Sequence, residues 1–379
     1  MIYLDNAATT RMREEVAEHI IEYLIEDYSN PSSVYKFGFE MEKKINDARS
    51  IIASALKVKA EEVYFTPGGT WSNNIAIRGI LDKGDFGKII TTETEHSSVL
   101  NPIKKFGEGR EIKYVKVDEF GFVDLKDLEI LLDKDTALVS IMHVNNELGT
   151  IQDIERIGKL IKEKSKALFH VDGVQGFCKV PVDIIKSKVD FYTFSSHKIH
   201  GPKGIGALYI KNGIKPMPIA YGGEQESGIS PGTENTTGIL GFAHAVKIAI
   251  DNYEEELSYV ERLKSRIIDG IGEKIKGFRV NSPGENSSPF IINIGFSGIK
   301  SEILLRMLDD EGICISAGSA CSKNKKSKTL ESVGVPKEFI DGSIRISPSH
   351  SNTPEECDIF IEKLNKCLVN IRKVIGKNG

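Results

Sequence analysis

The stretch Phe194-Ser195-Ser196-His197-Lys198-Ile199-His200-Gly201-Pro202 decides how the rest of the chain is interpreted. It places a lysine directly after an apolar, strand-like run, among small hydroxyl residues and a histidine. An earlier apolar run, Ala167-Leu168-Phe169, leads into His170-Val171-Asp172 and so ends in an acid. Because ligands of parallel α/β sheets collect where the strands end, we expect the acid and the lysine to share one site.

A lysine and a carboxylate in this order are the two groups that pyridoxal phosphate (PLP) chemistry requires. The lysine holds the aldehyde as a Schiff base, and the carboxylate keeps the pyridine nitrogen protonated, so that the ring acts as an electron sink. A lone lysine at a strand end is usually only solvated. The pair Asp172 and Lys198, with hydroxyls and His197 beside the lysine, therefore favours a PLP site.

Composition narrows the class of protein. The chain has 379 residues, 40% hydrophobic and 27% charged, as in a soluble globular protein large enough for two domains. Its net charge of −4 argues against general binding to nucleic acid or membrane surfaces. The apolar runs are shorter than the roughly 20 residues of a membrane span, and no signal peptide is visible, so we expect a cytoplasmic protein. Five cysteines without CxxC spacing argue against a disulfide framework or a zinc site.

Short apolar runs alternate with helical-period segments between residues 61 and 210. This alternation predicts an α/β fold with a mostly parallel sheet covered on both faces. Strands are expected at 63–65, 88–90, 112–115, 137–141, 168–171 and 191–194, with helices at 71–81 and 154–164 between some of them.

The later part of the chain predicts a smaller α+β domain. A long amphipathic segment at about 239–271 should lead into it, followed by strands at 290–294 and 343–347 and helices at 301–311 and 354–375. We therefore predict a large domain at 15–255, and a small domain formed by 1–14 and 256–379.

Three more motifs lie after predicted strands, and each has an ordinary structural alternative. The turn Gly68-Gly69-Thr70 precedes a helix, whose N-terminus favours a phosphate, although such turns are common without one. His96 is placed to stack on a cofactor ring and shuttle protons, or is simply satisfied within its loop. Asn146 is placed to hydrogen-bond a ring hydroxyl, or is only a turn residue.

Together these segments resemble the class V, fold-type I PLP enzymes, and among them the cysteine desulfurase family. The resemblance covers nearly the whole chain. It is carried by the motifs Tyr3-Leu4-Asp5-Asn6-Ala7-Ala8-Thr9-Thr10, Asn30-Pro31-Ser32-Ser33, Gly68-Gly69-Thr70, Glu95-His96, Asn145-Asn146-Glu147-Leu148-Gly149-Thr150, His170-Val171-Asp172, Ser195-Ser196-His197-Lys198, Gly232-Thr233-Glu234-Asn235 and Ser316-Ala317-Gly318-Ser319-Ala320-Cys321.

The resemblance implies a role for each matching residue. Lys198 would carry the cofactor, Asp172 would pair with the pyridine nitrogen, and His96 would stack on the ring. The phosphate group of the cofactor would be bound by Gly69, Thr70, Ser195 and His197. The ring hydroxyl would be bound by Asn146 and Gln175. Thr233 would reach the phosphate of a second subunit, which implies a homodimer with shared active sites.

Cys321 would carry the reaction type in such a family. By itself, an isolated cysteine is usually inert, but its neighbours are small, polar and cationic, and a positive field favours the nucleophilic thiolate. The resemblance implies that this thiolate takes sulfur from L-cysteine as a persulfide and leaves L-alanine, for iron–sulfur cluster or thio-modification pathways. Arg345 would bind the substrate carboxylate with its planar guanidinium, and Asn30 would also contact substrate.

Several departures from the family pattern concern substrate and partner. Trp71 stands where the family has an acid after the glycine turn. It either lines the pocket or the dimer face, or only packs its own helix, and helix packing is the favoured interpretation. Ser227 and Ser230 stand where the family has arginines, Glu224 stands for a glycine, and Pro348-Ser349-His350 follows Arg345. The loop after Cys321 is short and rich in lysine.

These departures leave alternatives open. The first is a selenocysteine lyase that releases selenium and L-alanine, because a selenol is more acidic than a thiol and needs less activation. The second is another PLP lyase or a transaminase, in which Cys321 would be dispensable. A non-enzymatic scaffold is disfavoured by the intact Lys198, Asp172 and His96. A protein that accepts the sulfur or selenium is a further possible partner.

Overall fold

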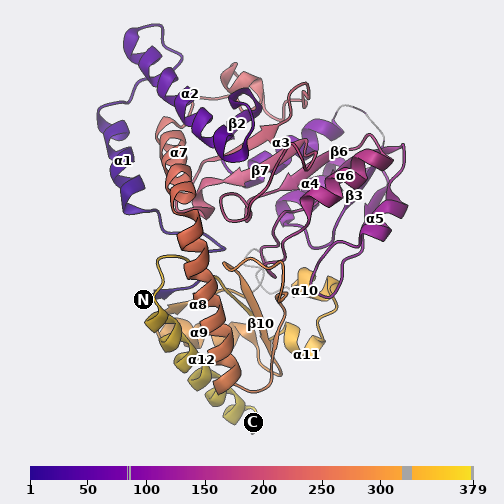
Figure 1. Ribbon diagram of the computed structural model, residues 1–379, viewed down its shortest axis with the longest axis vertical. Helices are drawn as coiled ribbons and strands as arrows, with labels where there is room; N and C mark the ends of the chain where they lie inside the picture. Colours follow the sequence, from indigo (N-terminus) through magenta and orange to yellow (C-terminus); the bar gives the residue numbers. More distant parts are fainter. Residues whose placement is uncertain (83, 85–86, 318–326, 377–379) are drawn as a thin grey trace.

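The computed structural model describes residues 1–82, 84, 87–317 and 327–376 (Figure 1). Its largest element is a seven-stranded sheet with the order β2-β8-β7-β6-β5-β3-β4. The strands are β2 (Val63–Thr66), β3 (Lys88–Thr91), β4 (Ile112–Tyr114), β5 (Thr136–Ser140), β6 (Leu168–Asp172), β7 (Phe191–Ser195) and β8 (Gly206–Ile210). Only β8 runs opposite to the other six strands, so the prediction of a mostly parallel α/β sheet is confirmed.

Successive residues of each strand enter different cores on the two faces of this sheet. Val139 and Tyr192 pack into one core, whereas Leu138 and Phe191, their neighbours in sequence, pack into the other. This pattern explains why the strands read as continuous apolar runs, since both faces are covered.

Helices supply the other half of each core. One face packs against α1 (Glu14–Ile25), α2 (Lys36–Leu56), α5 (Leu125–Leu131), α6 (Ile154–Lys164) and α7 (Thr236–Asp251). The opposite face packs against α3 (Gly69–Leu81) and α4 (Ser97–Phe106). Because Asp172 alternates with Val171, its side chain lies on the α3–α4 face, where the pocket forms.

A second core surrounds a three-stranded antiparallel sheet with the order β12-β10-β9. These strands are β9 (Phe278–Val280), β10 (Ile292–Phe296) and β12 (Ser343–Ile346), and they pack with α8 (Tyr253–Lys274), α9 (Ser301–Asp310) and α12 (Pro354–Val374). The short strand β1 (Ile2–Tyr3) joins this region by pairing with β11 (Ile313–Cys314). Two short helices, α10 (Lys328–Ser332) and α11 (Lys337–Ile340), lie between the two regions (Figure 1).

The structure corrects three details of the predicted elements. The segment at 239–271 is two helices, because α7 ends before Asn252 and α8 begins after it, although together they run through both regions (Figure 1). The strand expected at 290–294 begins only at Ile292, and β8 was not predicted as a separate strand. The division at 255/256 stays a prediction. In the described ranges, none of the helices combines the length and hydropathy of a membrane-spanning segment.

Candidate active site

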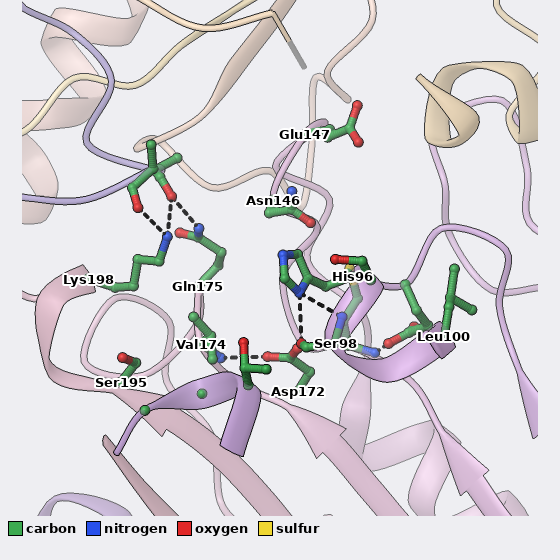
Figure 2. Close-up of a pocket in the computed structure, with 18 of the residues that line it drawn as sticks. His96, Ser98, Leu100, Asn146, Glu147, Asp172, Val174, Gln175, Ser195 and Lys198 are labelled. Carbon is green, nitrogen blue, oxygen red and sulfur yellow. Dashed lines mark hydrogen bonds between the residues drawn. The ribbon is translucent and has the colours of Figure 1, made fainter. Parts of the chain in front are cut away.

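A cavity of about 1040 Å³ lies at the carboxyl ends of the parallel strands (Figure 2). It is where an α/β sheet of this kind is expected to hold a ligand. The cavity is lined by ten of the residues singled out from the sequence, namely Gly69, Thr70, His96, Asn146, Asp172, Gln175, Ser195, His197, Lys198 and Arg345. Thr233 and Asn30 are exposed and do not line it, and Cys321 lies outside the described residues.

Asp172 is held as a hydrogen-bond acceptor at the end of β6. The side chain of Asn73, on α3, donates to one carboxyl oxygen at 2.8 Å, and the backbone N–H of Val174 donates to the other at 3.0 Å. The residue is only 5% exposed. A carboxylate fixed in this way is suited to accept a hydrogen bond from, and to balance the charge of, a protonated ring nitrogen.

Lys198 follows β7 in a short 3₁₀ turn, and its ammonium group faces the N-terminal segment. Its Nζ donates to the carbonyl oxygens of Ala7 at 2.6 Å and Ala8 at 2.7 Å. The side chain of Gln175 donates to the same Ala7 carbonyl at 2.8 Å (Figure 2). The segment before α1 therefore forms one side of the pocket and orients both side chains.

His96 caps the N-terminus of α4 with its Nδ1, which accepts from the backbone N–H of Ser98 at 3.2 Å. The Ser98 hydroxyl lies 2.7 Å from the same nitrogen and also accepts from Asn73. Burial lowers the pKa of His96, and the nearby Lys198 lowers it further, although Asp172 opposes this. The lowered pKa favours the neutral imidazole, and the bond that Nδ1 accepts from Ser98 assigns the ring proton to Nε2.

The glycine turn before α3 forms a cradle suited to a phosphate group. Gly68 has φ = 150°, and a Cβ on Gly69 would come within 2.8 Å of Val174 Cγ2, so neither position accepts a larger side chain easily. Gly69 and Thr70, the first residues of α3, line the cavity, and the first N–H groups of a helix have no partner within the helix. Among the described residues, the buried Ser195 hydroxyl has no hydrogen-bond partner. These donors fit a phosphate of the kind that PLP carries.

His197 completes this side of the pocket with a second neutral imidazole. Its Nδ1 lies 3.1 Å from the hydroxyl of Thr9. Burial lowers the pKa of His197 to about 4, with further lowering from Lys198 and Lys203. The ring can therefore donate or accept a hydrogen bond without adding charge.

The opposite wall of the pocket is formed by Asn146, Glu147 and Arg345. Arg345, on β12, is 2% exposed and donates to the Asn146 carbonyl oxygen and to an Asp5 carboxyl oxygen, each at 2.9 Å. Its guanidinium is thus already held in an ion pair within the protein. A substrate carboxylate would share or replace that pair.

Two buried carboxyls in the pocket were missed as site residues. Glu95 accepts hydrogen bonds from Thr92 and from the backbone N–H of Met142, and burial raises its pKa to about 8. Burial also raises the pKa of Glu147. Both stand beside an identified motif residue, His96 or Asn146, and that adjacency was the signal available in the sequence.

The family departures lie at different distances from the cavity. Trp71 lines it and is 41% exposed, so the favoured interpretation as a helix-packing residue is wrong. The segment containing Ser227 does not line the cavity. It is fixed by Glu226, which receives two hydrogen bonds from Arg49, at 2.6 and 2.7 Å.

His350 also lies away from the cavity lining. It contacts Arg13 and Glu256, and its ring packs edge-to-face on His200 with 4.4 Å between centroids. The altered residues that motivated the selenocysteine alternative are therefore not in the wall of the pocket formed by this chain.

Comparison with known proteins places this geometry in a family. Residues 2–360 match the model of the class-V aminotransferases. The chain is similar to the cysteine desulfurase IscS of Clostridium botulinum, with 40% identity over 98% of this chain and 96% of that protein. Among solved structures, a NifS-like protein superposes with a TM-score of 0.92 and 38% identity, covering 97% of this chain and 99% of the other. SspA in complex with cysteine superposes with a TM-score of 0.83 and 31% identity, covering 93% and 100%.

The family model covers most of the chain, and the named relatives match nearly its whole length. The chain belongs to the class-V aminotransferase family. Its relatives of nearly equal length include proteins named cysteine desulfurases.

Proposed function

We propose that this enzyme is a PLP-dependent cysteine desulfurase, which converts L-cysteine to L-alanine and transfers the sulfur to Cys321 as a persulfide. The observation that carries the proposal is the pocket that joins Lys198, Asp172 and Arg345 in a chain 40% identical to named cysteine desulfurases. The solved SspA structure with cysteine bound supports the same substrate.

The residues at the sheet edge would hold the cofactor. Lys198 would carry it covalently, Asp172 would accept a hydrogen bond from its ring nitrogen, and His96 would lie against the ring. The α3 N-terminus with Thr70, Ser195 and His197 would bind the phosphate, and Asn146 and Gln175 would reach the ring hydroxyl. When bound, PLP would supply an electron sink for the bonds at the substrate's α-carbon.

The other residues would bind the amino acid and move protons. Arg345 would bind the substrate carboxylate with two parallel hydrogen bonds. The amine of Lys198, once released from the cofactor, is suited to carry a proton to or from the α-carbon. The neutral His96 would offer its Nε2–H as a hydrogen-bond donor on the same side.

Cys321 would perform the sulfur transfer. Its thiolate would attack the substrate sulfur, so that a sulfur–sulfur bond forms as the bond between sulfur and the β-carbon breaks. The electron pair of the broken bond passes to the β-carbon, which takes up a proton, and alanine is released. The persulfide would then pass to an acceptor protein or thiol.

We also infer that the enzyme is a homodimer. Thr233 is exposed and does not line the cavity of its own chain, and the family pattern has it bind the phosphate of the second subunit. A dimer would therefore complete each pocket with a residue from the other copy.

The test is product analysis with L-cysteine and L-selenocysteine in parallel, using the purified PLP-loaded enzyme and the Cys321→Ala variant. We expect one alanine per cysteine and a trapped persulfide on Cys321, both lost in the variant. Turnover of selenocysteine alone would instead identify a selenocysteine lyase. Full alanine production by Cys321→Ala would contradict a persulfide mechanism.

A further inference from the structure

Asn73, on α3, is a buried amide that lies beside the cavity without lining it. Its side chain is 0% exposed. Its Nδ2 donates to a carboxyl oxygen of Asp172 and to the hydroxyl of Ser98, each at 2.8 Å. Both acceptor residues line the cavity. Because an amide nitrogen carries two hydrogens, these two bonds use both of them.

The contact with Asp172 decides which way the Asn73 amide faces. Half a turn of the amide would place its oxygen, Oδ1, against the Asp172 carboxyl oxygen, and two acceptors repel each other. In the observed orientation Oδ1 is buried, and it has no hydrogen-bond partner in the part of the chain that the structure describes. A buried acceptor without a donor costs stability. The bonds that Nδ2 donates are therefore what holds the amide in this orientation.

Ser98 passes the direction of these bonds on to His96. Its hydroxyl oxygen receives Asn73, so its single hydrogen is left for another acceptor. That acceptor is Nδ1 of His96, at 2.7 Å (Figure 2). The same nitrogen also accepts from the backbone N–H of Ser98 at 3.2 Å. A chain of donors therefore runs from Asn73 through Ser98 to His96.

This chain stabilises only the neutral form of His96. A protonated ring carries a hydrogen on Nδ1, so it would lose both bonds that this nitrogen accepts. The Ser98 hydroxyl would have to turn its own hydrogen away from the ring. Its oxygen would then face two donors, because Asn73 already points a hydrogen at it. Removing Asn73 therefore makes that turn easier, and removing the hydroxyl takes away the bond altogether.

We propose that Asn73 is a positioning residue that couples Asp172 to His96, because one amide holds the Asp172 carboxyl and, through the Ser98 hydroxyl, sets the hydrogen-bonding direction of His96. The ring keeps Nδ1 as an acceptor and its proton on Nε2. The coupling itself is a property of this chain, whereas its value for the reaction rests on the proposed function, in which His96 lies against the cofactor ring.

Several ionisable groups surround His96, and the substitutions that test the coupling leave them in place. Burial is the largest cause of the lowered pKa of His96, Lys198 and Arg345 lower it further, and Asp172 opposes them. Two neighbouring carboxyls, Glu95 and Glu147, have pKa values raised by burial. A change in the His96 pKa that depends on the Ser98 hydroxyl can therefore be separated from the effects of these charges.

The experiment is a double-mutant cycle on the pKa of His96, with Asn73→Ala, Ser98→Ala and the double variant. The pKa is followed by ¹⁵N NMR of the full chain without cofactor, and the His96 signal is assigned by its loss in His96→Gln. We expect Ser98→Ala to raise this pKa by about one pH unit and Asn73→Ala by about half a unit. The double variant should equal Ser98→Ala, since Asn73 acts through that hydroxyl.

Asn74→Ala is the matched control. Asn74 is the next residue of α3, does not line the cavity, and donates only to the backbone carbonyl of Thr70, at 2.9 Å. It should leave the His96 pKa unchanged. In the PLP-loaded enzyme, the acid limb of kcat/KM for L-cysteine should move to higher pH in Ser98→Ala and Asn73→Ala by the same amounts as the pKa.

Three results would overturn the proposal. An unchanged His96 pKa in Ser98→Ala would show that the hydroxyl does not act on the ring. An equal effect of Asn73→Ala with and without the Ser98 hydroxyl would show that Asn73 acts on His96 by another route, such as Asp172. Shifted pKa values with an unchanged acid limb would show that the coupling does not serve the reaction. Absence of alanine formation by the wild-type enzyme would instead reject the proposed function, and the NMR cycle would still measure the coupling.

Discussion

The floor and the wall of the pocket are built differently. The floor, formed by Asp172, His96 and Lys198, lies on the large sheet and is held by hydrogen bonds from nearby strands, helices and the N-terminal segment. The wall, formed by Asn146, Glu147 and Arg345, is held by bonds that cross between the two cores. The bonds of Asp172 and His96 therefore stay within the large-sheet region, and Lys198 is also held by the N-terminal segment. The wall instead depends on how the two cores are joined.

This difference separates two kinds of chemistry. A cofactor that stays bound through many turnovers needs a rigid floor whose charges do not change. A substrate that enters and leaves needs a wall whose ion pair can be exchanged, as the pair between Arg345 and Asp5 can be. Substitutions in the floor should therefore abolish activity, and substitutions in the wall should mainly change substrate binding or sulfur transfer.

Lys198→Ala should give the largest effect. Loss of the covalent attachment and of the amine that carries protons should lower turnover by about 10³-fold or more. The absorbance band of the lysine-bound cofactor should also disappear from the purified protein. Lys211→Ala is a suitable control, because that lysine is half exposed beyond the end of β8 and pairs with Asp190. Residual turnover above a tenth of wild type would contradict the proposed role of Lys198 in holding the cofactor and carrying protons.

Acid should weaken the unit that carries the floor. Burial lowers the pKa to about 4 for His143, His170 and His197 and to about 3 for His200. Below pH 6.5 these histidines bind protons in the unfolded chain but stay neutral in the folded protein. The free energy of unfolding that is present above pH 6.5 is therefore lost as the pH falls.

The opposing carboxyls are fewer. Glu95, with its pKa raised to about 8, keeps its proton in the folded protein between pH 5 and 6.5, and burial also raises the pKa of Glu147, so both carboxyls oppose the loss of stability in acid. Burial also lowers the pKa of His96, so the histidines outnumber the carboxyls and we expect a net loss of stability as the pH falls from 6.5 to 5.

Urea unfolding of the cofactor-free protein at pH 7.5, 6.5 and 5.5 measures this loss. Trp71, the only tryptophan, reports on the large-sheet region by fluorescence, and amide exchange in β10 and α12 reports on the second core. We expect the first probe to lose stability sooner. Parallel losses in both probes would show that the two cores unfold as one unit.

Arg345→Lys should mainly affect substrate binding. A point charge cannot reproduce the two parallel hydrogen bonds of a guanidinium, so KM for cysteine should rise about 10–100-fold while kcat changes less. Steady-state kinetics at fixed ionic strength measures both. Arg279→Lys is the control, because Arg279 pairs with the exposed Glu119 at 3.3 Å. A decrease in kcat without a change in KM would indicate that Arg345 acts on the reaction at the cofactor rather than on substrate binding.

The sequence predicted the floor better than the wall, for a physical reason. Asp172 and Lys198 each end a strand, and parallel strand ends meet at one edge, so their meeting follows from the strand pattern alone. The contacts of Glu147 with Ser327 and Thr329 join residues far apart in sequence, and they depend on how α10 and α11 pack. No local pattern encodes such a contact.

Strand boundaries and breaks show the same limit. The strand β8 follows β7 without an intervening α-helix, so the alternation of strands and helices that predicted the sheet did not mark it as a separate strand. The break between α7 and α8 at Asn252 interrupts an amphipathic pattern that is otherwise continuous. From its residue type alone, Trp71 was expected to pack its helix, and only the fold shows that it lines the cavity instead.

The smallest effect should distinguish two adjacent serines. The hydroxyls of Ser195 and Ser196 are both buried without a hydrogen-bond partner among the described residues, but only Ser195 lines the cavity. Ser195→Ala should therefore leave the cofactor-free protein as stable as wild type and weaken PLP binding about tenfold, because the hydroxyl serves the phosphate and no protein group. Ser196→Ala should leave PLP affinity unchanged. The PLP affinity of each variant is measured by titration of the cofactor-free protein with PLP. Equal affinities would show that Ser195 does not bind the phosphate, which would then be held by the α3 N-terminus and His197.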